Sequence, residues 1–248
     1  MAASADHLSV PAAGGGADLP PLTLSRTNPT APCIHVCAFS GDSDMLVAGW
    51  LRVAGDAVTS KTAVTAWADF REQLSVDPAL NIRRGDTLRA RKLAAGQGRP
   101  RPSSTRRGPS KAEQWGYRHV LRRGLTAIAS LPGTTVGTAR TGPATPTATE
   151  AVLKRLAKDA GPSVSGAAVI RTTAATASWY DLATASPLAV DRHSDTAAHI
   201  SAGTDSLLEA AEFVAYCAYQ FLARRYNRRF LWEWLPELLP DATKPINL

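Results

Sequence analysis

Apolar residues recur at two different spacings along residues 33–226, and this alternation restricts the fold more than any other feature of the sequence. Short apolar runs between turn residues are typical of strands, whereas apolar residues three and four positions apart are typical of amphipathic helices. The expected strands are 34–38, 46–51, 134–139 and 166–172. The expected helices are 60–74, 110–131, 147–160 and 206–226. The order β-β-α-α-β-α-β-α predicts an α/β fold in which helices flank a mixed sheet.

The connections between these elements carry signals of their own. Residues 41–44 read Gly-Asp-Ser-Asp, which predicts a hairpin turn between the first two strands. A Ser or Thr followed three residues later by Glu is a capping box, in which each side chain bonds the backbone N–H of the other residue. Three such boxes, Ser110–Glu113, Thr147–Glu150 and Ser206–Glu209, are expected to begin the last three helices.

Composition divides the chain into three parts. Residues 1–32 are rich in Gly, Pro and Ala, which predicts a disordered tail. Residues 33–229 form the expected domain, and within it residues 77–110 read as a flexible basic insertion. Residues 230–248 form an apolar C-terminal segment, which must bury itself against its own core or dock on a partner or second copy through Trp232, Trp234 and Leu235.

Positive charge is concentrated in one region. The formal net charge is +7, but residues 83–123 hold thirteen Arg or Lys against Asp86 and Glu113, so the rest of the chain sums to −4. A local excess of this kind favours an anionic partner. The expected nucleic-acid-binding residues are Arg83, Arg84, Arg89, Arg91, Lys92, Arg106, Arg107, Lys111, Arg118, Arg122 and Arg123. A solvated surface is the alternative interpretation.

The type of contact follows from the residues in this region. A mobile arginine-rich loop beside a basic helix face suits contacts to phosphates, and nothing in the sequence places side chains against base edges, so sequence preference should be weak. Residues 83–123 contain few aromatic side chains, which argues against a stacking platform for single strands in this segment. A second cluster, Arg224, Arg225, Arg228 and Arg229, lies where cations complement the dipole at the end of the last helix.

The remaining composition indicates a cytoplasmic protein. The cysteines, Cys33, Cys37 and Cys217, form neither a disulfide framework nor a zinc spacing, and their odd number suits a reducing compartment. The N-terminal residues do not read as a signal peptide. No run approaches the about 18 apolar residues of a membrane span, so no membrane partner is expected. No sequence motif indicates a cofactor.

Two segments resemble a known family. Residues 34–53 read IHVCAFSGDSDMLVAGWLRV, and residues 207–225 read LLEAAEFVAYCAYQFLARR. Together they resemble the two ends of domain-of-unknown-function family 3800, which is ribonuclease H-like. In that family the first strand ends in Asp-Glu-Ser-Gly, and the late helix carries Gln-Leu-Ala-Asp. Here these positions read Ala38-Phe39-Ser40-Gly41 and Glu209-Ala210-Ala211-Glu212.

The resemblance implies a fold but not its chemistry. Ribonuclease H-like nucleases hold two divalent metals on several convergent carboxylates. Ala38 and Phe39 cannot bind a hard cation, and the strand near Ile170 continues with Arg171 where an acid is expected. Glu212 alone retains a carboxylate at a matched position, and one carboxylate does not hold two metals. We therefore expect a degenerate nuclease: a non-catalytic, nucleic-acid-binding domain without a cofactor.

Relocated acids are the alternative. An active nuclease would use Asp42, Asp44 and Glu212 as catalytic residues with Mg²⁺ or Mn²⁺, although Asp is also an ordinary turn residue. A second group of candidate metal ligands is Asp191, His193, Asp195 and His199. Glu212 shares a helical stripe with Leu208 and Tyr219, so it should face the core as a remnant ligand or as the partner of an amide or an Arg.

Overall fold

A computed structural model of the chain describes residues 33–53, 57–80, 82–97, 109–143, 145–160, 166–171, 178–181, 186–187 and 195–248. Within these ranges the strands form one mixed sheet in the order β6-β5-β4-β1-β2-β3-β7. The strands are β1 (Cys33–Gly41), β2 (Leu46–Val53), β3 (Thr134–Thr141), β4 (Gly166–Arg171), β5 (Ser178–Asp181), β6 (Ser186–Pro187) and β7 (Ile246–Asn247).

The central strand β1 pairs with one antiparallel and one parallel neighbour. The β1–β2 hairpin places Ala38 opposite Gly49, and the parallel β4 places Arg171 beside Ala38. Strand β3 continues the antiparallel part beyond β2. Strand β1 is therefore flanked on both sides as far as Ala38, and among the described residues its last three positions pair with β2 alone.

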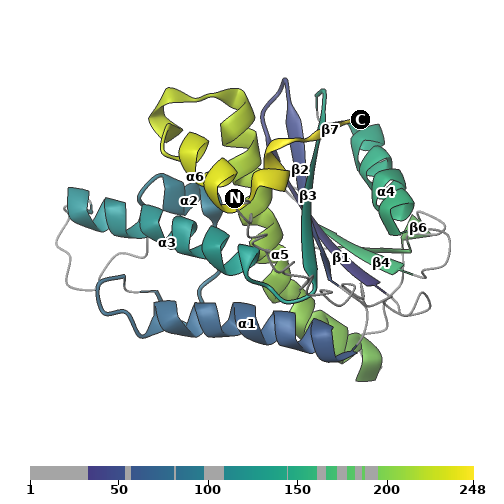
Figure 1. Cartoon of the computed structure of the whole chain (residues 1–248), viewed down its shortest axis with the longest axis horizontal. Coiled ribbons are helices and arrows are strands. Elements are labelled where there is room, and N and C mark those ends of the chain that lie inside the picture. Colours follow the sequence, from purple (N-terminus) through teal and green to yellow (C-terminus); the bar gives the residue numbers. More distant parts are fainter. Residues whose placement is uncertain are drawn as a thin grey trace, which may run out of the picture.

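The helices cover the sheet unequally. They are α1 (Ala57–Ser75), α2 (Ala90–Ala94), α3 (Lys111–Ala129), α4 (Pro146–Ala160), α5 (Asp195–Ala223) and α6 (Leu231–Leu238), with 3₁₀ turns η1 (Tyr226–Arg228) and η2 (Pro240–Thr243). Helix α5 crosses one face with α1 and α3 outside it, and α4 lies on the other side of the sheet (Figure 1). None of the helices within the described ranges is long and apolar enough to cross a bilayer.

Close packing of α5 on the sheet depends on a glycine. A Cβ atom at Gly49 would lie 2.4 Å from the backbone N of Ala215, which is closer than real Cβ atoms come. Farther from the sheet, the buried Trp67 of α1 contacts the ring of Phe213 in α5 edge to face, with centroids 5.8 Å apart. Helix α5 thus lies between the sheet and the outer helices α1 and α3.

Most of the expected elements are present. The hairpin, the strands 134–139 and 166–172 and the helices 60–74 and 147–160 are confirmed, with shifts of a few residues at their ends. The capping box of α3 is confirmed in detail, because Ser110 Oγ accepts from the N–H of Glu113 and Glu113 Oε2 accepts from the N–H of Ser110. The prediction for Ser206–Glu209 is wrong: α5 begins at Asp195, so this sequence lies inside the helix.

The prediction of a flexible insertion over 77–110 is wrong for its first part. Leu80, Ile82, Leu88 and Leu93 are buried in the hydrophobic core, and α2 lies within this stretch. Residues 98–108, like the expected tail 1–32, lie outside the described residues.

The apolar C-terminal segment folds back on its own chain. Leu231, Trp234 and Leu235 of α6 belong to the same core as the sheet. Beyond α6, Thr138 of β3 donates a hydrogen bond to the carbonyl of Ala242 at 2.9 Å. Packing against the chain's own core is confirmed. Trp234 and Leu235 are buried there and are not available to dock on a partner.

Candidate functional site

A cavity of about 760 Å³ opens where the end of β1 meets α2, the C-terminal half of α5 and η1. The last four residues of β1 and the first residue of the following turn line one side of the cavity. They are Ala38, Phe39, Ser40, Gly41 and Asp42, and only Asp42 carries a carboxylate. The helices and the 3₁₀ turn contribute Arg89, Arg91, Lys92, Glu212, Tyr216, Tyr219, Gln220, Arg225, Asn227 and Arg228. We call this site the basic pocket.

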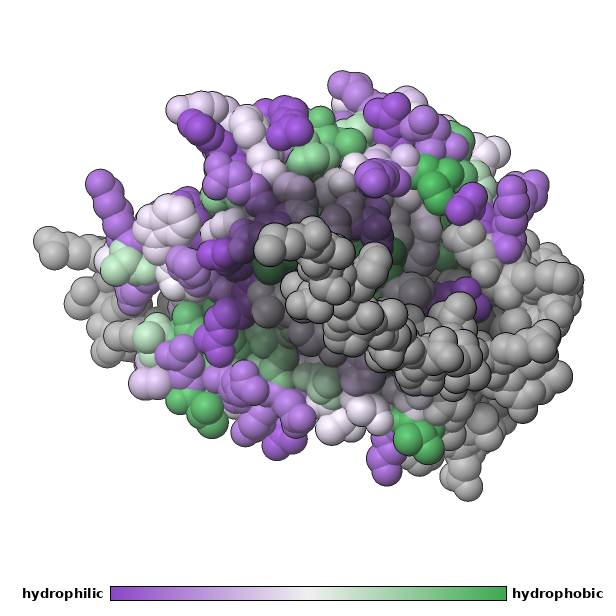
Figure 2. All heavy atoms as spheres, viewed as in Figure 1, coloured by the Kyte–Doolittle hydropathy of each residue, from purple (hydrophilic) through white to green (hydrophobic). Residues whose placement is uncertain are grey.

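The basic pocket lies where the resemblance implied a nuclease site. Such a site would be lined by negatively charged carboxylates, whereas this cavity has a positive net charge. Five of the side chains that line it are cationic and two are carboxylates. In the space-filling view, hydrophilic residues dominate the upper edge of the described surface, over the β1–β2 turn and the end of α5 (Figure 2). A net positive cavity attracts anions and raises their local concentration.

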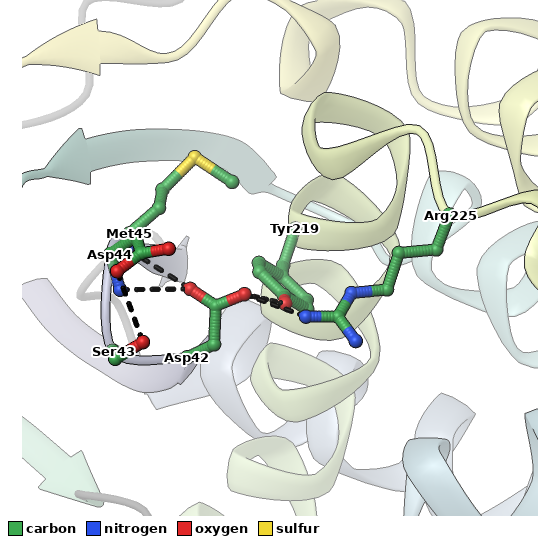
Figure 3. A network of polar contacts seen from close by, with 6 residues as sticks. All are labelled: Asp42, Ser43, Asp44, Met45, Tyr219 and Arg225. Atoms are coloured by element: carbon green, nitrogen blue, oxygen red, sulfur yellow. Dashed lines mark hydrogen bonds and ion pairs between the residues drawn. The ribbon is translucent and has the colours of Figure 1, made fainter.

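Asp42 holds two walls of the basic pocket together (Figure 3). Its Oδ1 accepts hydrogen bonds from the backbone N–H groups of Asp44 and Met45, both at 3.1 Å. Its Oδ2 accepts from the Tyr219 hydroxyl at 2.6 Å and from Arg225 at 2.7 Å. These donors, with Tyr219 the strongest, hold the pKa of Asp42 well below its ordinary value.

The two turn carboxylates do not converge on a common point in the basic pocket. Asp44 accepts a hydrogen bond from the Ser43 hydroxyl at 3.0 Å and is not among the residues that line the cavity. Asp42 bonds its own turn, as turn aspartates commonly do. The interpretation of Asp42 and Asp44 as joint metal ligands is therefore not supported by their geometry.

Glu212 lines the basic pocket and pairs with an arginine. Arg89 Nη1 lies 2.9 Å from Glu212 Oε2, and the Glu212 side chain is 17% exposed. The sequence suggested that Glu212 is either a remnant metal ligand or the partner of an amide or an arginine. In the structure its partner is Arg89. The stripe of α5 that carries Glu212, Tyr216 and Tyr219 faces the cavity.

The more deeply buried acid of α5 is Glu209, one turn earlier. Glu209 accepts a hydrogen bond from the backbone N–H of Leu88 at 2.9 Å and pairs with Arg71 of α1 at 3.4 Å. Arg71 also donates to the carbonyls of Arg84 and Asp86. Burial raises the pKa of Glu209, against the opposing effect of Arg71. This cluster fixes residues 84–88, and with them the start of α2, to α1 and α5.

The described residues do not offer a metal site. They contain no group of three or more His, Cys, Asp or Glu side chains that could hold an ion. Ala38 and Phe39 line the basic pocket at the positions where the resemblance places acids. Asp191 and His193 lie outside the described residues, and for Asp195 and His199 the description covers only the backbone of α5. The donor set around Asp42 and Glu212 does not fit two divalent metals.

The expected nucleic-acid-binding residues fall into separate groups. Arg89, Arg91 and Lys92 line the basic pocket. Arg83, Arg84 and Lys111 are exposed outside it, and Arg84 pairs with Glu72. Arg106 and Arg107 lie outside the described residues.

The arginines of α3 are engaged by their own chain. Arg118 donates to the carbonyl of Ala94, Arg122 pairs with Glu237 at 2.6 Å, and Arg123 pairs with Asp77 at 3.4 Å. Their contribution to phosphate binding stays a prediction, but each must first leave or share its present contact.

Arg225, Arg228 and the two tyrosines of the basic pocket were not among the predicted site residues. The sequence could have indicated them, because Glu212, Tyr216 and Tyr219 follow helical spacing and Arg225 continues from the same helix end.

No family model matches the chain, and comparison with curated proteins and with solved structures gave no match. The chemistry of the basic pocket is therefore the basis for assigning a function.

Proposed function

We propose that the basic pocket binds phosphate groups of a nucleic acid and that the chain is a non-catalytic nucleic-acid-binding protein. The observation that carries this proposal is that the cations lining the basic pocket outnumber its carboxylates, so three remain when each carboxylate is matched with one arginine. Arg225 and Arg89 neutralise Asp42 and Glu212, respectively. Arg91, Lys92 and Arg228 also line the cavity, and no carboxylate among the described residues pairs with them.

The unpaired cations suit phosphate in geometry as well as charge. Arg228 Nε donates to the Tyr216 hydroxyl at 3.2 Å, which fixes the guanidinium at the wall of the cavity. Arginine donors in a fixed plane match phosphate oxygens, and lysine adds a mobile point charge. Contacts of this type depend little on base sequence.

The absence of catalysis is supported by the contents of the same cavity. The sheet, with β1 between an antiparallel and a parallel neighbour, is compatible with the ribonuclease H-like fold that the resemblance implies. Ala38 and Phe39 offer no oxygen ligands from their side chains. Asp42 already accepts four hydrogen bonds, so binding a metal would require breaking them. The active-nuclease alternative has no comparable observation in its favour.

The test is a salt titration of binding. Fluorescence anisotropy should detect binding of labelled oligonucleotides, and the logarithm of affinity should fall linearly with that of salt. Replacing Arg91, Lys92 and Arg228 together by Ala should weaken binding and make the slope shallower by about 2 to 3, since each phosphate contact contributes about 0.7 to 0.9.

A matched control removes the same charge elsewhere. Lys154, Lys158 and Lys244 are exposed, and the first two lie on α4, across the sheet from α5. Replacing these three by Ala lowers the net charge equally but should change the slope little. Equal effects of the two triple variants, or no binding by the wild type at low salt, would refute the proposal.

A further inference from the structure

An unusually exposed aromatic side chain lies beside the basic pocket. Tyr226 is 80% exposed, the highest value among the large hydrophobic side chains that the structure describes as exposed. It begins η1, and its neighbours Arg225, Asn227 and Arg228 all line the cavity. An aromatic ring held in water leaves apolar surface uncovered, and such surface in proteins often belongs to a binding site.

Tyr226 differs in its contacts from Trp115, the other Phe, Trp or Tyr that the structure describes as exposed. Trp115 is 46% exposed, but it packs against Phe230 and lies under the guanidinium of Arg118. Within the described part of the chain, Tyr226 has neither a ring partner nor a cation over its ring. Its ring therefore has faces available for stacking.

The backbone around Tyr226 is held in place. The N–H of Arg228 bonds the carbonyl of Arg225 at 2.9 Å, and the N–H of Arg229 bonds the carbonyl of Tyr226 at 3.1 Å. The side chains on either side are anchored too, since Arg225 pairs with Asp42 and Arg228 bonds Tyr216. A ring on this short turn keeps a defined position relative to the phosphate-binding cations.

We infer that Tyr226 stacks on an unpaired nucleobase whose phosphate lies in the basic pocket, so that the ligand is a single-stranded nucleic acid. The inference rests on the proposed function and narrows its ligand. Proteins that bind single strands combine a cationic groove with aromatic platforms, because every base has a face on which a ring can stack. In a duplex those faces are covered by neighbouring bases, so stacking would require unpairing.

The test uses three ligands of equal length: a single-stranded oligonucleotide, the same backbone without bases, and a duplex. The wild type should bind the single strand more tightly than either of the others. Tyr226→Ala should weaken binding of the single strand by about 5- to 150-fold, the range for loss of one base–aromatic stack. The same variant should leave binding of the abasic backbone unchanged, whereas Tyr226→Trp should retain affinity for the single strand.

The controls distinguish stacking on Tyr226 from phosphate binding in the basic pocket. Trp115→Ala removes an exposed aromatic side chain of α3 that does not line the basic pocket, and it should not affect binding of any of the three ligands. If Tyr226→Ala binds the single strand as the wild type does while the triple variant of Arg91, Lys92 and Arg228 is impaired, stacking is refuted and phosphate binding stands. If that triple variant binds all ligands normally, both fail. Equal wild-type affinity for single strand and abasic backbone also refutes stacking.

Discussion

Asp42 and Arg225 lie 183 residues apart in the chain, yet their side chains meet at 2.7 Å. The contact joins the β1–β2 turn to the chain just beyond α5, and the Tyr219 hydroxyl bonds the same carboxylate oxygen. Burial and this hydrogen bond raise the pKa of Tyr219, so its hydroxyl keeps its proton, and can donate it to Asp42, to a higher pH than an ordinary tyrosine. One carboxylate thus fixes two walls of the basic pocket relative to each other.

Asp42→Asn should lower the melting temperature at neutral pH, and the difference from the wild type should shrink in acid. The folded state lowers the pKa of Asp42, so this carboxylate stabilises the fold above its ordinary pKa of 3.8. That contribution is lost as the pH falls below 3.8. Thermal unfolding of both proteins across this range measures the difference. A difference that stays constant down to the lowest pH would show that the network does not depend on the charge.

Glu209→Ala should destabilise the fold by about 3–5 kcal/mol, because it leaves the buried guanidinium of Arg71 without its counter-charge and the N–H of Leu88 without an acceptor. Urea unfolding gives the value. Glu72→Ala is the control, since its pair with Arg84 is solvent-exposed and should contribute at most about 1 kcal/mol. Equal losses in the two variants would contradict the anchoring of residues 84–88 by Glu209.

Gly49→Ala should cost about 1–3 kcal/mol through overpacking, because the added methyl group would press on the backbone of Ala215. Gly142→Ala is the matched control, since a Cβ atom there would have no neighbour within 4 Å. Denaturant unfolding compares the two. If both glycine variants are as stable as the wild type, α5 can move away from β2 at little cost.

Magnesium or manganese should not stimulate cleavage of DNA, RNA or hybrid duplexes, because the basic pocket lacks convergent carboxylates that are free to bind an ion. Incubation of labelled substrates with each metal, followed by gel analysis, checks this. Metal-dependent cleavage that disappears in Glu212→Ala or Asp42→Ala would favour the nuclease with relocated acids instead.

The regular part of the fold could be predicted from periodicity, and the part held by long-range contacts could not. Trp67, Leu121 and Val152 follow helical spacing, and each lies buried in the expected helix. Residues 80–94 lack such spacing and carry several charges, so they read as a loop. Their order depends on Glu209, which is 121 residues away from its partner Leu88.

The candidate site was predictable only in pieces. Its position at the end of β1 and the participation of Glu212 followed from what the resemblance of two short segments to a known family implied. The pairing of Glu212 with Arg89, and the approach of Arg225 to Asp42, depend on how distant segments pack. Arg225 and Arg228 could be identified as a cationic cluster at a helix end, but not as one wall of a cavity.

The gathering of five cations around one cavity also has a cost for the protein itself. Like charges brought together by folding repel one another, and this repulsion is weaker in the unfolded chain, where the segments are far apart. Dissolved polyvalent anions that bind only the folded form would relieve it and raise its apparent stability. The ionic composition of the surroundings is therefore part of what determines how firmly this fold holds together.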